Sequence, residues 1–300
     1  MTDQTPNIAE RIDGRAIAQK LRDNLAKAVS KMQTEHGITP ALAVVLVGAD
    51  PASEVYVRMK GKQTKEIGMI SIEHKLAADT PEQDVLDLVQ RLNEDASVNG
   101  ILVQFPVPDH ISQQKIIELI SPDKDVDGLH PINAGKLASG VEGLISCTPL
   151  GCVMLAKQTL GDLTGLNAVV VGRSNLVGKP VAQLLLKENA TVTICHSRSR
   201  EIEKICAGAD LLVVAVGRAD MVKGSWVKKG ACVIDVGMNR VAQDGKKDKL
   251  TGDVDAAEVE LVAGSLTPVP GGVGPMTIAC LLHNTLQACC AQNGIEMVEV

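Results

Sequence analysis

Two runs of alternating apolar and helical segments constrain this chain more than any other feature. In the first run, strands are predicted at residues 41–48, 70–76 and 100–105, where apolar side chains cluster or alternate. Helical patterns lie before, between and after these strands, at residues 15–35, 51–67, 81–95 and 112–120. Such a βαβ series predicts a parallel sheet with helices on its faces.

The second run begins after a loop rich in Pro, Gly and Asp at residues 121–137. That composition marks a domain boundary or an active-site loop. A helix is predicted at residues 148–160, and strands are predicted at residues 167–171, 191–195, 211–216 and 231–236. We therefore predict an α/β chain with two consecutive parallel-sheet domains, in keeping with its length of 300 residues.

Composition excludes several other classes of protein. Hydrophobic residues make up 45% of the chain and charged residues 22%, which is typical of a compact protein and not of a disordered one. The formal net charge is −6, and the only aromatic residues are Tyr56, Phe105 and Trp226. A nucleic-acid partner is therefore not expected.

Three further features bear on location. All eight cysteines lie from Cys147 onward without a C-x-x-C pair, so we expect buried thiols in a reducing compartment and no metal site. The first residues, MTDQTPNIAER, lack the basic and apolar blocks of a signal peptide, which favours the cytoplasm. Residues 261–295 carry no charged side chain, but Pro and Gly interrupt them, so we expect a buried helix there and no membrane span.

A strand, a glycine-containing turn and a helix follow one another at residues 167–185. This arrangement directs free backbone N–H groups and the positive end of a helix dipole at a phosphate. Gly172, Ser174 and Gly178 give the spacing G-x-S-x-x-x-G, one residue longer than the dinucleotide fingerprint. By itself the spacing fits either a cofactor loop or a plain tight turn.

The end of the next strand favours NADP over NAD. An NAD site usually places an acid there for the ribose hydroxyls, whereas a 2′-phosphate needs cations and hydroxyls. Residues 191–200 contain no acid and end in HSRSR, and Arg173 lies in the preceding loop. The alternative is that these arginines form a solvated face.

Candidate catalytic residues follow the strands of the first domain. Ser53, Tyr56 and Lys60 are spaced to lie on one face of the helix at residues 51–67. Gln104 closes the third strand, and Asp127 is one of two aspartates in the loop KDVDG. Ligands of parallel sheets bind outside the carboxyl ends of strands, which supports a site here. The alternatives are a surface stripe, a strand cap and ordinary turn residues.

Seven segments in order resemble one family. YVRMK, VQFPVP, KDVDGLHPIN, CTPLG, GRSNLVGKP, TVTICHS and PVPGGVGPMT occur as expected of the bifunctional methylenetetrahydrofolate dehydrogenase/methenyltetrahydrofolate cyclohydrolase family. The resemblance covers residues 13–290. It implies oxidation of 5,10-methylenetetrahydrofolate by NADP, then hydrolysis of the 5,10-methenyl product to 10-formyltetrahydrofolate, within one-carbon metabolism and purine biosynthesis.

The resemblance also implies roles for the candidate residues. Tyr56 would pack on the folate, and Lys60 would be the central catalytic residue. At an ordinary pKa of about 10.4, only about one lysine in 2500 is neutral at pH 7, so a basic role requires a lowered pKa. Gln104 would position Lys60, and Asp127 would accept hydrogen bonds from the pterin. The remaining implied substrate contacts are Ser53, Gly271, Gly272 and Val273. The implied NADP contacts are Gly172, Arg173, Ser174, Gly178, His196 and Ser197.

Together these expectations define two domains with a cleft between them. Residues 1–147 would form an N-terminal βαβ-type folate-binding catalytic domain, completed by a C-terminal helix at residues 275–300. Residues 148–274 would form a Rossmann-like NADP-binding domain. By the same resemblance, the enzyme is expected to be a cytoplasmic homodimer with a small-molecule folate substrate and no nucleic-acid or membrane partner.

Two other functions fit parts of the sequence. One is a different NADP-dependent oxidoreductase on a similar two-domain frame, acting on an amino or hydroxy acid without folate. The other is a non-enzymatic nucleotide-binding or scaffold protein, in which Tyr56, Lys60, Gln104 and Asp127 are ordinary structural residues.

Overall fold

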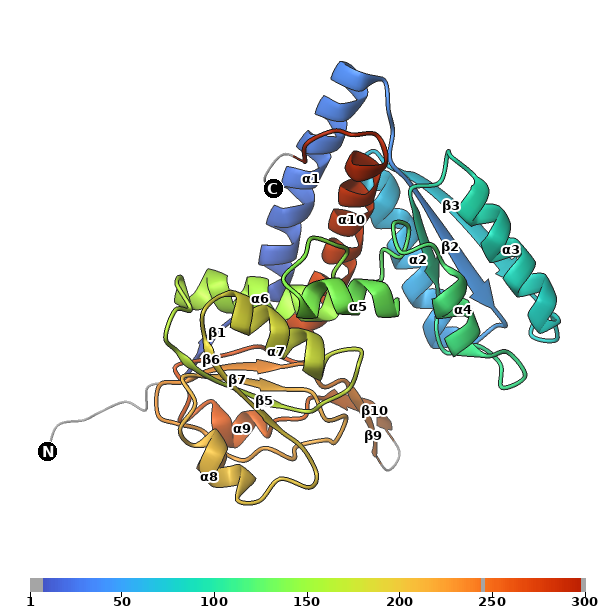
Figure 1. The fold of residues 1–300 in the computed structure, drawn as a ribbon. Helices are drawn as coiled ribbons and strands as arrows, with labels where there is room; N and C mark the ends of the chain where they lie inside the picture. Colours follow the sequence, from blue (N-terminus) through green and yellow to red (C-terminus); the bar gives the residue numbers. More distant parts are fainter. Residues whose placement is uncertain (1–7, 244–245, 298–300) are drawn as a thin grey trace, which may run out of the picture. The chain divides into compact units, whose positions relative to one another are not determined.

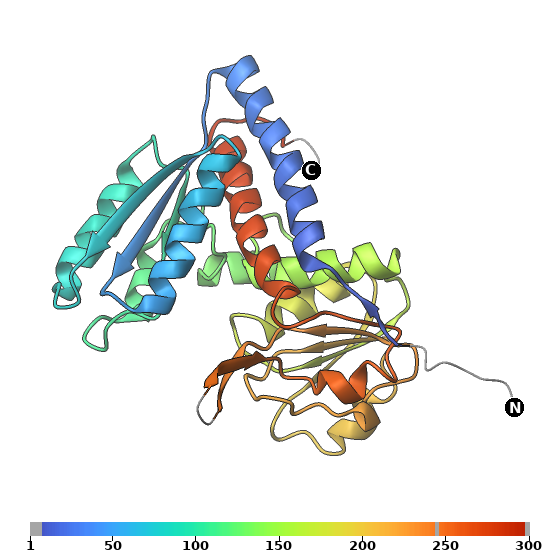
Figure 2. The same ribbon diagram turned by 180° about the vertical axis from the view of Figure 1, so that it is seen from behind.

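The computed structural model describes residues 8–243 and 246–297, so residues 1–7 of the leading MTDQTPNIAER segment lie outside them. The chain divides into two compact units. We call them the three-stranded unit (Gln19–Cys147 and Ile278–Val300) and the six-stranded unit (Met1–Ala18 and Thr148–Thr277). Figures 1 and 2 show the elements of each unit.

The three-stranded unit contains a parallel sheet in the order β3-β2-β4. Its strands are β2 (Ala41–Val47), β3 (Ile70–Leu76) and β4 (Gly100–Val103). Four of its helices are α2 (Pro51–Glu66), α3 (Glu82–Glu94), α4 (Gln113–Leu119) and α5 (Pro131–Ala138). The predicted α/β order is confirmed, with element ends that differ by a few residues.

The central strand explains the apolar run ALAVVLV. Every residue of β2 is buried, because neighbouring strands pair with both of its edges and helices cover both of its faces. Ala43, Val45 and Val47 pack against the apolar side of α3, which presents Val85 and Val89. Helices α3 and α4 lie on one face of the sheet and α2 lies on the other (Figures 1 and 2).

Helix α5 lies in a segment that the sequence predicts as loop. Pro131 occupies its first turn, where a missing N–H costs nothing, and the Nδ1 atom of His130 accepts a hydrogen bond from Ile132 N at 3.0 Å. The loop prediction was wrong for this stretch, because a histidine is an uncommon helix cap and Gly135 lowers the helical signal.

Two long helices complete the three-stranded unit. They are α1 (Gly14–His36) and α10 (Val273–Gln292), which lie side by side in both views (Figures 1 and 2). The Sγ atom of Cys289 lies 3.8 Å from the Sδ atom of Met32. Most side chains of α10 are buried around its circumference, which explains why this helix carries no charged face.

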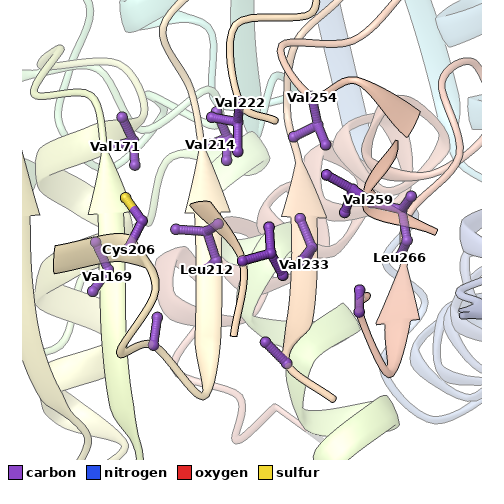
Figure 3. Close-up of a cluster of buried hydrophobic side chains, with 14 of the residues drawn as sticks. Val169, Val171, Cys206, Leu212, Val214, Val222, Val233, Val254, Val259 and Leu266 are labelled. Carbon is purple, nitrogen blue, oxygen red and sulfur yellow. The ribbon is translucent and has the colours of Figure 1, made fainter. Parts of the chain in front are cut away.

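The six-stranded unit contains a parallel sheet in the order β1-β11-β8-β7-β5-β6. In that order the strands are Glu10–Arg11, Ser265–Leu266, Cys232–Asp235, Leu211–Val214, Asn167–Val171 and Thr191–Cys195. The helices are α6 (Cys147–Leu160), α7 (Gly178–Lys187), α8 (Ile202–Cys206), α9 (Ala256–Val259) and the short 3₁₀ helix η1 (Gly224–Trp226). Figure 3 shows Val169, Leu212 and Val233 on neighbouring strands of its apolar core.

Two features of this unit differ from the predicted organisation. Strand β1 pairs with β11, so residues 10–11 belong to this sheet, although residues 1–147 were expected to form one domain. A hairpin of β9 (Asn239–Gln243) and β10 (Lys246–Thr251) was not predicted, because its strands are short and polar. Within the described residues, no helix is both long enough and apolar enough to cross a membrane.

Candidate functional site

The start of α2 directs three side chains from one helix face. The Asp50 side chain caps the helix by accepting from Ser53 N at 2.8 Å, and Pro51 occupies the first turn. Ser53 is only 4% exposed, whereas Tyr56 is 37% exposed and presents part of its ring to solvent. Lys60 follows one turn later and is half-buried. The helix thus carries an accessible aromatic ring next to a partly desolvated amine.

Gln104 is fixed so that its carbonyl oxygen meets Lys60. The backbone N–H of Gln104 donates to Val45 O at 2.8 Å, which holds the residue just beyond β4. Its side-chain Nε2 donates to Phe105 O at 2.7 Å, and its Oε1 accepts from Lys60 Nζ at 2.9 Å. The structure therefore joins two residues that were predicted as a catalytic lysine and its positioning group.

Burial and charge act in opposite directions on Lys60 and Asp127. Burial lowers the pKa of Lys60 below its ordinary value, while the negative charge of Asp127 works against that shift. Burial raises the pKa of Asp127, while the charge of Lys60 and a hydrogen bond with Cys147 oppose the rise. The site is thus a partly desolvated amine and carboxyl pair, suited to proton exchange and to binding N–H groups.

The two aspartates of KDVDG have different environments. Asp125 accepts hydrogen bonds from Leu129 N at 3.2 Å, His130 N at 2.8 Å and Asn133 Nδ2 at 3.0 Å. Burial raises its pKa to about 6. Asp125 therefore organises the loop, whereas Asp127 is the aspartate that interacts electrostatically with Lys60.

Cys147 and Asn284 also contact this loop, and the sequence argument did not single them out. Cys147 Sγ donates to Val126 O at 3.2 Å, and burial raises its pKa well above the usual range, so it stays a thiol. Asn284 Nδ2 donates to Val126 O at 2.9 Å and to Ile145 O at 2.7 Å. Two sequence features could have pointed to these residues. Cys147 begins the segment CTPLG, and Asn284 is a polar amide inside an uncharged helix, where a buried amide needs hydrogen-bond partners.

In the six-stranded unit, the loop after β5 requires both of its glycines. Gly172 has φ +128°, and a Cβ there would overlap the carbonyl oxygen of Ala215. A Cβ on Gly178 would overlap the carbonyl oxygen of Gly172. Ser174 Oγ accepts from Val177 N at 3.1 Å and from Gly178 N at 3.3 Å, so its hydroxyl holds the turn against the first residues of α7. The longer G-x-S-x-x-x-G spacing thus forms a close turn at a helix N-terminus.

The segment after β6 lies at the same edge of the sheet. Gly172 N donates to Cys195 O at 2.8 Å, which joins the ends of β5 and β6. His196 N donates to Ser199 Oγ at 3.0 Å, and Arg198 N donates to His196 Nδ1 at 3.1 Å. Arg173 and Ser197 are exposed beside these turns. A close backbone turn with exposed cationic and hydroxyl groups fits a phosphorylated dinucleotide.

The PGGVG segment also lies in the six-stranded unit, where α10 begins. Gly271 has φ +111°, a conformation that favours glycine. A Cβ on Gly272 would lie 2.7 Å from the Thr267 side chain and 2.8 Å from Pro268 O. Val273 is the first residue of α10. Among the described residues, no group of three or more His, Cys, Asp or Glu side chains is arranged to hold a metal ion.

Comparisons with known proteins match family models to the N-terminal and the C-terminal part of the chain. The family model "Tetrahydrofolate dehydrogenase/cyclohydrolase, catalytic domain" matches residues 12–127, and "Tetrahydrofolate dehydrogenase/cyclohydrolase, NAD(P)-binding domain" matches residues 146–293. The chain is 60% identical over 285 residues to the bifunctional protein FolD of Rhodopseudomonas palustris (strain BisB18), covering 95% of this chain and 97% of that protein. It is 59% identical over 292 residues to the protein of the same name from Afipia carboxidovorans, covering 97% and 99%.

Solved structures show the same fold. The FolD methylenetetrahydrofolate dehydrogenase/cyclohydrolase of Campylobacter jejuni aligns with a TM-score of 0.89 at 44% identity, covering 94% of this chain and 99% of that one. The enzyme of Trypanosoma brucei, solved with NADP cofactor and inhibitor, aligns with a TM-score of 0.89 at 36% identity, covering 95% and 98%.

Proposed function

Since this chain belongs to the tetrahydrofolate dehydrogenase/cyclohydrolase family, we propose that Lys60, held by Gln104, is the proton acceptor of its hydrolytic step. The enzyme oxidises 5,10-methylenetetrahydrofolate to the 5,10-methenyl compound with NADP and hydrolyses that product to 10-formyltetrahydrofolate. The observation that carries the proposal is the 2.9 Å contact between Lys60 Nζ and Gln104 Oε1.

The hydrolytic step needs a group that takes a proton. When the oxygen of water bonds to the cationic methenyl carbon, one water proton must leave. Burial lowers the pKa of Lys60, which increases the neutral fraction that can accept this proton. Gln104 Oε1 fixes Nζ in position, and its own Nε2 is held by Phe105 O. Gln104 would therefore hold Lys60 in a fixed position from which its Nζ accepts the water proton.

Folate binding is proposed for the three-stranded unit. Asp127 would accept hydrogen bonds from the amino and ring N–H groups of the pterin, a role that suits a partly desolvated carboxylate. Tyr56 would pack on the folate through its exposed ring, and Ser53, which is buried, would be a further substrate contact at the start of the same helix. Gly271, Gly272 and Val273 are further proposed substrate contacts, made through backbone atoms.

NADP binding is proposed for the six-stranded unit. When bound there, NADP would supply the acceptor for the hydride that leaves the one-carbon bridge. Gly172, Ser174 and Gly178 would admit the pyrophosphate to the N-terminus of α7. Arg173 and Ser197, beside His196, would bind the 2′-phosphate.

We further propose the roles of the two units and the setting in which they work. The three-stranded unit would be the folate-binding catalytic domain, and the six-stranded unit would be the NADP-binding domain, as the matched descriptions support. The active enzyme would be a cytoplasmic homodimer without nucleic-acid partners, and its product would supply formyl groups for purine biosynthesis.

Replacement of Lys60 tests the hydrolytic proposal. Lys60→Met is expected to lower hydrolysis of 5,10-methenyltetrahydrofolate by about 100-fold or more, because it removes the proton acceptor. NADP affinity should stay unchanged, since Lys60 lies in the other unit. Both quantities are measured on purified protein, by absorbance of the methenyl compound and by titration with NADP.

Lys62→Met provides the matched control. Lys62 lies on the same helix, and its exposed side chain pairs with Glu66 at 3.6 Å, an interaction of little energetic weight. Its hydrolysis rate should equal that of the parent. An unchanged rate in Lys60→Met would remove Lys60 from the mechanism.

A further inference from the structure

Three consecutive backbone N–H groups in the six-stranded unit converge on one carboxylate. Val216 N and Gly217 N donate to Asp253 Oδ2 at 2.7 and 2.9 Å, and Arg218 N donates to Asp253 Oδ1 at 2.9 Å. Asn239 Nδ2 donates to Oδ1 at 2.9 Å. Successive N–H groups of this kind form an anion-binding concavity. Here the protein fills it with its own carboxylate.

The surroundings enclose this carboxylate completely. Asp253 is 0% exposed. A Cβ on Gly237 would overlap the Asp253 carboxylate, so only glycine fits beside it. Four donors meet one buried charge, and charge-assisted hydrogen bonds of this type are about twice as strong as neutral ones. The segment at residues 216–218 is therefore held much more firmly than a typical exposed loop.

The segment lies next to the dinucleotide loop. It follows β7, whose neighbour β5 leads directly into Gly172. Ala215 N donates to Val171 O at 2.8 Å, and Ala215 O occupies the space that a Cβ on Gly172 would need. A shift of residues 215–218 would therefore move against the backbone of Gly172.

We propose that Asp253 is a positioning residue for the dehydrogenase reaction, in which its buried carboxylate fixes residues 216–218 against the first glycine of the cofactor loop. The inference rests on the proposed NADP site at residues 172–178. Because Asp253 is 0% exposed, it would act through the backbone of the 216–218 segment and not by direct contact with a ligand.

Asp253→Asn tests this role on the full-length enzyme. The amide keeps the size of the side chain but replaces one acceptor oxygen with an NH₂ group that faces N–H donors. We expect the KM for NADP to rise about tenfold or more. The loss of one charge-assisted hydrogen bond loosens residues 216–218, and NADP binding must then fix this segment at a similar cost in free energy. Hydrolysis of 5,10-methenyltetrahydrofolate, assayed without NADP, should stay within about twofold of the parent. A merely structural role would lower both activities together.

Asp162→Asn is the matched control. Asp162 is an exposed residue of the same unit whose Oδ1 accepts from Thr164 N at 2.9 Å. Neither activity should change in this variant. An unchanged KM for NADP in folded Asp253→Asn would overturn the inference, as would a parallel loss of both activities.

Gly217→Ala decides the question if Asp253→Asn does not fold. Gly217 has φ +67°, and nothing lies within 4 Å of a Cβ there, so alanine strains the segment without a clash. We expect a selective rise in the KM for NADP, and an unchanged KM would overturn the inference. Arg173→Ala distinguishes failure of the positioning role of Asp253 from failure of the proposed NADP site. If it weakens NADP while Asp253→Asn and Gly217→Ala do not, only the positioning role fails; if none of the three variants weakens NADP, the proposed cofactor site fails as well.

Discussion

Burial and charge compete on single side chains of the proposed folate site. Lys60 loses hydration, which favours its neutral form, while Asp127 favours its charged form. The contact with Gln104 adds a geometric restraint that neither effect supplies. A lysine that is partly desolvated, paired and held at one distance is able to exchange a proton without losing its position.

Cofactor choice is also decided at single residues. Arg173→Ala is expected to raise the KM for NADP about tenfold or more and to change the KM for NAD less than about twofold, because only NADP carries the 2′-phosphate. Steady-state dehydrogenase assays with both nucleotides measure this. Equal weakening of NADP and NAD would contradict the assignment of Arg173 to the 2′-phosphate.

Among the secondary-structure elements, α10 connects the proposed folate site to a distant part of the sequence. Its Asn284 holds the carbonyl groups of Val126 and Ile145, which immediately precede Asp127 and the Ser146–Cys147 pair. One amide of this helix therefore fixes two loops of the three-stranded unit. No local pattern at residues 126 or 145 indicates this partner.

Asn284→Leu should disturb both loops. Two buried carbonyl groups lose their donor, so we expect the free energy of unfolding to fall by about 2–4 kcal/mol. The KM for folate should rise, while the Kd of NADP should not change. Denaturant unfolding and ligand titrations measure these effects, and Gln287→Leu, a half-buried amide of the same helix, is the control. An unchanged folate KM would show that the amide stabilises the helix only.

Local sequence signals predict some elements of this fold and miss others. The strand at Ala41–Val47 and the turn at Gly172 were predictable, because a continuous apolar run and a glycine turn before a helix are local signals. Strand β1 was not, because its two residues are defined by pairing with β11, far away in the chain. The contact of Lys60 with Gln104 was inferable, because the two residues follow the carboxyl ends of the neighbouring strands β2 and β4. The Asn284 contacts were not, because they depend on tertiary packing alone.

For the whole molecule, the buried carboxyl of Asp235 makes stability depend on pH. Its oxygens accept from Gly237 N, Asp253 N and Val254 N, yet burial, reinforced by Asp253, raises its pKa to about 7. The folded state thus keeps a proton that the unfolded state releases near pH 3.8. This group therefore stabilises the fold most at low pH, and its contribution is lost as pH rises from about 4 to about 7.

Asp235→Asn should remove that dependence. Between pH 5 and pH 7, the unfolding free energy of the parent is expected to fall by about 2 kcal/mol relative to the variant, since each pH unit contributes about 1.4 kcal/mol until the folded carboxyl itself begins to ionise near pH 7. Denaturant unfolding of both proteins at several pH values measures the difference. Parallel curves for parent and variant would contradict the raised pKa of Asp235.

The whole molecule combines two linked activities in one chain. The most direct test supplies purified protein with 5,10-methylenetetrahydrofolate and either NADP or NAD, and then supplies 5,10-methenyltetrahydrofolate alone, with both reactions followed by absorbance. We expect NADP-dependent oxidation that exceeds oxidation with NAD, and accelerated hydrolysis without any nucleotide. Activity with neither folate would contradict the assignment of both reactions to this protein.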